Sequence, residues 1–64
     1  MSYTIEDAKI VKGTGKAIFV EAPELGEGTW IPSSQVDEDS EIWKEGEFGD
    51  LLVTDWFAEQ QGWL

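Results

Sequence analysis

The apolar positions near the N-terminus alternate with polar ones and predict a β-strand over residues 3–12. The parity of this alternation changes between Ile5 and Ala8, so the strand must slip by one residue there. A β-bulge near residues 6–7 would produce such a slip. The first strand is therefore predicted to be long and irregular.

A second strand is predicted over residues 16–22, and it is apolar on both faces. Ile18 and Val20 share one face, whereas Ala17 and Phe19 share the other. This pattern favours either a central position in the sheet or a strand whose far face meets the helix. An acidic loop with two glycines follows, and it leads into a third strand over residues 29–31. We expect residues 18–21 and 29–31 to pair as a β-hairpin.

The third strand is predicted to stop at Pro32. Trp30 and Ile31 precede it and must point to opposite faces of the sheet. Proline has no backbone N–H, so this strand should end there or lie at a sheet edge. Residues 33–35 suit a single 3₁₀ turn, beneath which Val36 can pack.

The C-terminal third predicts two more strands, at residues 42–44 and 51–53, and a helix over 55–61. Thr54 suits the N-cap of that helix and Gly62 its left-handed C-terminal position. A helix this short is unstable alone and must be held by packing. The residues predicted to provide this packing are Trp56, Trp63 and Leu64.

About five short strands and a terminal helix indicate a mainly β protein. The predicted architecture is a small, strongly bent antiparallel barrel, SH3-like or OB-like, formed by residues 1–64 as a single domain.

Charge changes the picture of possible partners. Fourteen acidic residues face four lysines and no arginine, for a net charge of −10. Direct binding to nucleic acid or to an anionic membrane is therefore disfavoured, and a protein with a basic surface is the expected partner. Nucleic-acid binding would need Lys9, Lys12 and Lys16 on one face with aromatic rings between them.

Residue types also restrict the chemistry. Cysteine and histidine are absent, which removes thiolate metal sites, the commonest zinc ligand and the usual general base. Asp37, Asp39 and Glu41 have the spacing of a calcium loop, but Ile42 and Phe48 stand where that loop needs Gly and Glu. We expect a solvated acidic connection, no metal, no cofactor and no enzymatic activity. The N-terminus has no signal-peptide pattern, and no apolar run approaches the ~20 residues of a membrane span.

Two resemblances add to these expectations. The segment Ile-Pro-Ser-Ser-Gln-Val at residues 31–36 resembles the Pro-Ser-x-x-Val segment of SH3 domains. More of the chain resembles a family of small uncharacterised bacteriophage and prophage proteins. Its motifs are Ala-Ile-x-Val at residues 17–20, Trp-Ile-Pro-x-Ser-Gln-Val at 30–36 and Trp-x-Ala-Glu-x-x-Gly at 56–62. This resemblance implies a phage or prophage origin, without implying an activity. Since neither a signal peptide nor a membrane span is indicated, we expect a location in the cytoplasm of the host cell.

The leading functional hypothesis is a small accessory protein that binds a basic surface of a host or phage protein. The residues predicted to make this contact are Trp43, Asp37, Glu38, Asp39 and Glu41. One alternative is a nucleic-acid mimic that inhibits a host DNA-binding, RNA-binding or defence protein. Another is a structural component that self-associates through an open sheet edge.

Overall fold

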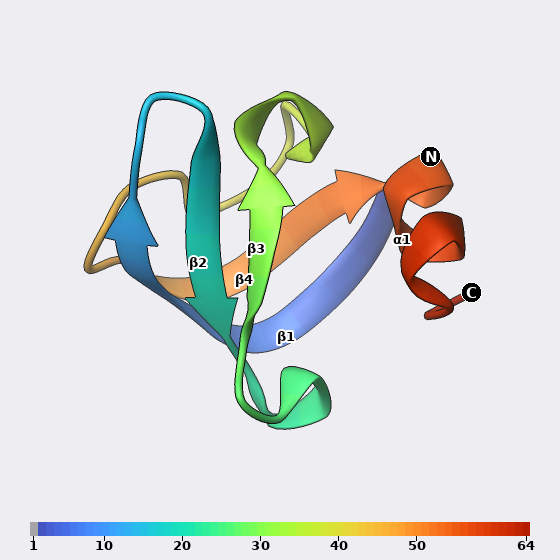
Figure 1. Cartoon of the computed structure of the whole chain (residues 1–64), viewed down its shortest axis with the longest axis horizontal. Coiled ribbons are helices and arrows are strands. Elements are labelled where there is room, and N and C mark those ends of the chain that lie inside the picture. Colours follow the sequence, from blue (N-terminus) through green and yellow to red (C-terminus); the bar gives the residue numbers. More distant parts are fainter. Residues whose placement is uncertain (1) are drawn as a thin grey trace.

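The computed structural model describes residues 2–64 as one antiparallel sheet with a short helix at its end (Figure 1). The strands are β1 (Ser2–Gly13), β2 (Ala17–Glu21), β3 (Thr29–Pro32) and β4 (Phe48–Thr54). The helical segments are η1 (Pro23–Leu25), η2 (Ser33–Gln35) and α1 (Asp55–Gln61). The strand order is β3-β2-β1-β4, so β2 is central, as predicted.

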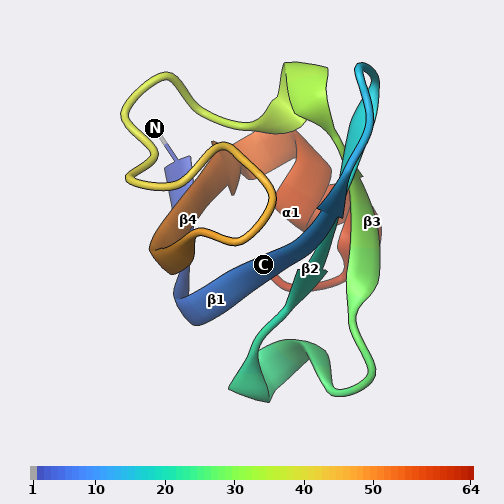
Figure 2. The same ribbon diagram turned by 90° about the vertical axis from the view of Figure 1, so that its left-hand side faces the viewer.

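The sheet is organised around β1, which is long and bent. It pairs with β4 from Ser2 opposite Thr54 to Ile5 opposite Leu51, and again from Ala8 opposite Gly49 to Lys9 opposite Phe48. The register shifts between Ile5 and Ala8, where Asp7 has a φ of 54°. This irregularity confirms the predicted bulge, and it bends β1 so that its second half can pair with β2 (Figure 2).

The core lies on the concave side of this bent sheet. The large side chains that are fully buried are Ile5, Ile10, Val20, Ile31, Leu51 and Val53. Each such side chain stabilises the fold by ~1.5–3 kcal/mol relative to an exposed one. Ile42 and Phe57 complete the same cluster from outside the sheet.

The β3 edge carries few free backbone groups. The Ser33 amide donates to the Lys16 carbonyl at 2.8 Å, and antiparallel alternation then directs the backbone groups of Ile31 toward β2. The backbone groups of Trp30 and Pro32 accordingly point away from β2, toward the open edge, and proline has no N–H to donate there. The predicted edge position of Pro32 is confirmed, and it shortens the edge available to another strand.

The β4 edge is covered by the chain that follows η2. Val36 forms an isolated bridge with Val53, and the Asp37 amide donates to the Leu52 carbonyl at 2.8 Å. Further along, the Glu41 amide donates to the Asp50 carbonyl at 3.2 Å. The segment 36–41 thus bonds to backbone groups on the outer edge of β4 that could otherwise pair with another strand.

The prediction of a mainly β antiparallel fold with one C-terminal helix is confirmed, but two details differ. The sheet has four strands, because residues 42–44 form none, and β4 begins at Phe48 instead of residue 51. Residues 42–44 leave the extended conformation because Ile42 turns into the core and the next two backbone amides bond to the Glu47 carboxylate. The sheet is open, and its closure into an SH3-like or OB-like barrel stays a prediction.

Helix α1 has the predicted bounds and caps. The Thr54 hydroxyl accepts from the Phe57 amide at 3.2 Å, and Gly62 adopts a left-handed conformation with φ 81°. Trp63 packs edge-on against Phe57, with ring centroids 5.8 Å apart. Trp56, predicted to pack the helix, is instead 59% exposed because seven residues of helix bury only one face. Leu64, predicted to do the same, is 65% exposed. No helix within residues 2–64 is long and apolar enough to cross a membrane.

Candidate functional site

The residues predicted to bind a partner all lie between Val36 and β4, in a segment we call the acidic loop (residues 37–47). It contains six carboxylates, at positions 37, 38, 39, 41, 45 and 47, and one lysine, Lys44. Figure 2 shows this loop, in yellow to orange, on the side of the molecule away from β2 and β3. Asp37, Glu38, Asp39, Glu41 and Trp43 are therefore brought onto one side of the fold.

Ser40 attaches the acidic loop to the sheet. Its side chain is only 8% exposed, although serine is polar and the loop is otherwise largely solvent-facing. The hydroxyl donates to the Ile42 carbonyl at 2.9 Å and accepts from the Leu52 amide at 3.1 Å. One buried hydroxyl thus satisfies two backbone groups and fixes the distance between loop and β4.

Trp43 is held in place by the same turn of the loop. Its indole N–H donates to the Ser40 carbonyl at 2.9 Å, yet 43% of the side chain remains exposed. The amides of Trp43 and Lys44 both donate to Glu47 Oε1, at 2.7 and 2.6 Å. These hydrogen bonds lower the pKa of Glu47, because they stabilise the ionised carboxylate. The bond from the Trp43 amide has the larger effect and the bond from the Lys44 amide the next.

The predicted acids differ in what their carboxylates do. Asp37 Oδ1 accepts from the Asp39 amide at 2.9 Å, and Glu41 Oε1 accepts from the Asp50 amide at 3.3 Å. Glu38 and Asp39 are exposed on the turn between Asp37 and Glu41. The first two acids therefore help to shape the loop, whereas Glu38 and Asp39 are the better placed for a partner.

The structure adds residues that the sequence reasoning missed. Glu45 Oε1 accepts from the Gly13 amide at 3.1 Å and so ties the far end of the loop to β1. Phe48, at the start of β4, is 67% exposed. For Glu45 the sequence signal is the continuation of acidic residues beyond Glu41, and this does not indicate a backbone partner so distant in the chain.

The carboxylates of the loop are spread along the chain and do not converge. Within residues 2–64, no group of three or more acids is arranged to hold a metal ion. No pocket opens anywhere in the same range. The acidic loop is a negatively charged surface with a partly exposed indole, that of Trp43.

Comparisons with protein-family models, with curated proteins and with solved structures found no match to this chain.

Proposed function

We propose that this protein is a small non-enzymatic accessory protein that binds a basic surface of another protein through the acidic loop. The observation that carries the proposal is a half-exposed Trp43 among six carboxylates on a loop held by hydrogen bonds to β1 and β4. A loop fixed in this way loses little conformational entropy on binding, which favours affinity.

Charge and aromatic surface have separate roles in this proposal. The loop carries a charge of −5, from six acids and one lysine, and such a field accelerates encounter with a basic partner. Tryptophan is among the residues that contribute most to interface affinity. Trp43 would act as the anchor, and Glu38 and Asp39 would meet lysine or arginine side chains of the partner.

The resemblance to bacteriophage and prophage proteins supports a bacterial host protein as the partner and the host cytoplasm as the location. A partner whose basic surface is itself a nucleic-acid cleft would make this protein a nucleic-acid mimic. Self-association is less well supported, because Pro32 shortens one sheet edge and segment 36–41 covers the other.

The test is affinity capture from a bacterial lysate with the wild-type protein and two charge-matched double variants. Glu38→Lys with Asp39→Lys changes the acidic loop, whereas Glu27→Lys with Glu59→Lys makes the same net change of +4 elsewhere. The proposal expects a protein retained by the wild type and the control but reduced at least tenfold with the loop variant. Equal retention by both variants would contradict it.

The aromatic anchor is tested with the captured protein. Trp43→Ala is expected to weaken binding by about tenfold or more, whereas Trp56→Ala, at a similarly exposed site on α1, should have little effect. Competition by DNA for the captured protein would identify the mimic. Circular dichroism of each variant shows whether the fold is kept.

A further inference from the structure

A second surface lies on the outer, convex side of the sheet, opposite the core. Two rows of directly paired residues cross it. The residues on both sides of Lys9, Phe19 and Glu21 are buried, so these three side chains point away from the core. Their cross-strand partners share the same side of the sheet. The rows are Lys12–Phe19–Trp30 and Phe48–Lys9–Glu21. We call these six residues the lysine–aromatic face.

Aromatic rings on this face are exposed and supported. Trp30 is 51% and Phe48 67% exposed. Phe19 lies between Trp30, with ring centroids 5.2 Å apart, and Gly28, where an added Cβ would come within 2.7 Å of the Phe19 ring. Phe19 therefore packs beside Trp30, and Phe48 lies on β4, two strands from β2 and in the other row.

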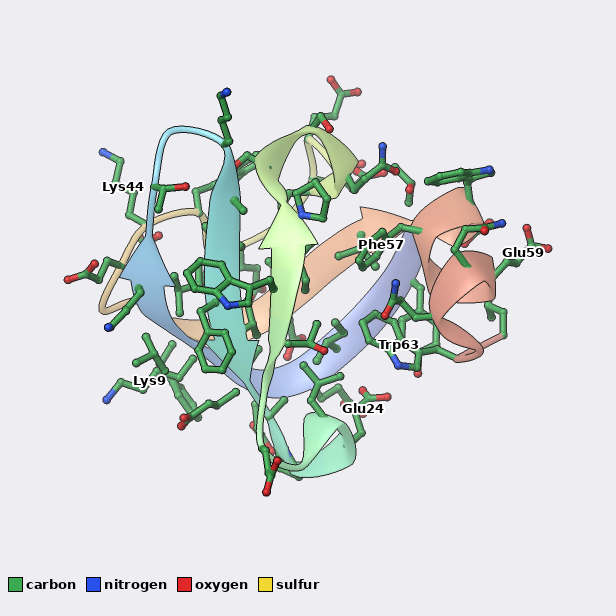
Figure 3. The ribbon with its side chains drawn as sticks, in the orientation of Figure 1. Lys9, Glu24, Lys44, Phe57, Glu59 and Trp63 are labelled. Carbon is green, nitrogen blue, oxygen red and sulfur yellow. The ribbon has the colours of Figure 1, made fainter. Side chains whose placement is uncertain are left out.

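The six residues of this face carry two lysines and one acid, Glu21, so their summed charge is +1 although the whole chain carries −10. Two further acids, Glu47 and Asp50, lie on either side of Phe48 in the chain. Residues 36–41 run along the β4 edge, whereas the end of the acidic loop reaches β1, where the Gly46 amide donates to the Ile10 carbonyl at 2.7 Å. Lys9 projects at the end of the molecule away from α1 (Figure 3). The Debye length is ~8 Å at physiological salt, so acids farther than this from Lys9 and Lys12 are largely screened from them.

We propose that the lysine–aromatic face binds single-stranded nucleic acid. Exposed rings offer stacking surfaces to unpaired bases, and the lysines between Phe48 and Phe19 lie where a backbone crossing the strands would place its phosphates. A duplex hides its base faces in its own stack and cannot use these rings. Nucleic-acid binding was expected to need Lys9, Lys12 and Lys16 on one face with aromatic rings between them. The structure places Lys9 and Lys12 on β1 with rings on the strands to either side, and Lys16 lies outside the two rows.

The overall charge of −10 and the absence of arginine limit the strength of this binding. Two lysines release few counterions, so the salt dependence should be shallow, with a slope of log K against log salt of about −1.4. Affinity is expected in the range of about 1–100 μM, typical of non-specific binding. This surface adjoins the end of the acidic loop at Phe48, but it would bind a different class of partner, so the inference goes beyond the proposed function.

The experiment measures fluorescence anisotropy of a labelled 15-nucleotide thymidine oligomer at 50 mM and 150 mM salt. Trp30→Ala is expected to weaken binding about tenfold, within the range for loss of one stacked base, and Trp56→Ala should leave it unchanged. Trp30→Leu keeps apolar bulk without the ring, so it tests stacking even if the alanine variant unfolds. Equal binding by Trp30→Leu and the wild type would overturn the proposal, as would the absence of binding at 1 mM protein and 50 mM salt.

A second arm tests the charge. Lys12→Gln and Gln60→Glu both bring the net charge to −11, but only the first lies on the face. Lys12→Gln should reduce the salt slope by about 0.7 and Gln60→Glu should not. Polyglutamate that competes as well as the oligomer would assign the face to acidic proteins and overturn the proposal. The Glu38 and Asp39 lysine variant should bind the oligomer no more weakly than the wild type, so this result and that of the proposed function are independent.

Discussion

Replacing Ser40 with alanine should destabilise the protein far more than loss of a loop hydroxyl usually does. The substitution removes two hydrogen bonds and leaves the Leu52 amide and the Ile42 carbonyl without that partner. Ser40 is 8% exposed, so water reaches these groups poorly. Two lost bonds at ~0.5–1.5 kcal/mol each, with a donor left unsatisfied, give an expected loss of about 2–3 kcal/mol.

The expected loss of about 2–3 kcal/mol is a large share of the total free energy of unfolding. A chain of 64 residues has an unfolding free energy of about 3–10 kcal/mol at the usual value per residue. Each kcal/mol corresponds to ~4–8 °C in Tm for a domain of this size, so Ser40→Ala should lower Tm by about 10–20 °C. The indole N–H of Trp43 bonds to the Ser40 carbonyl, and its NMR signal should shift as the loop loosens.

Urea unfolding followed by tryptophan fluorescence measures the change, with an unchanged m-value as the check on two-state behaviour. Ser34→Ala is the matched control, because Ser34 is exposed in η2, and it should alter the free energy of unfolding by less than ~0.5 kcal/mol. If Ser40→Ala also stays within that limit and the Trp43 indole signal does not move, the attachment of the loop through Ser40 is wrong.

Three further predictions concern the helix and the loop. Thr54→Ala removes the acceptor of the Phe57 amide and should cost ~0.5–2 kcal/mol in urea unfolding. Gly62→Ala places a side chain at φ 81° and should cost about 1 kcal/mol, seen as a lower Tm. The pKa of Glu47 is lowered in the fold, so its stabilising contribution is complete above the unfolded pKa of about 4.5 and is lost as pH falls through the folded value. Glu47→Gln should therefore show a smaller fall in urea midpoint between pH 7 and pH 3 than the wild type, and an equal fall would contradict the assignment.

Features that depend on near neighbours in the chain were predictable. The bounds of α1 follow from Thr54 and Gly62, because a cap acts on amides three or four residues away. The bulge at Asp7 follows from a change of parity within a single strand, and the pairing of β2 with β3 from a short loop between them. In each case the sequence separation is small, so the local pattern already contains the physical cause.

Features that depend on distant parts of the chain were decided by tertiary structure. Residues 42–44 are strand-like in composition, but burial of Ile42 and the carboxylate of Glu47 hold them in a turn. The acids of the site were identifiable from the sequence, whereas the anchoring of Glu45 to Gly13, 32 residues away, was not. Lys12, Phe19 and Trp30 become neighbours only because β1, β2 and β3 pair in this order and register. Residue type determined which side chains could act on a partner. Strand pairing determined which of those side chains share a surface, because contact across a sheet depends on register and not on distance along the chain.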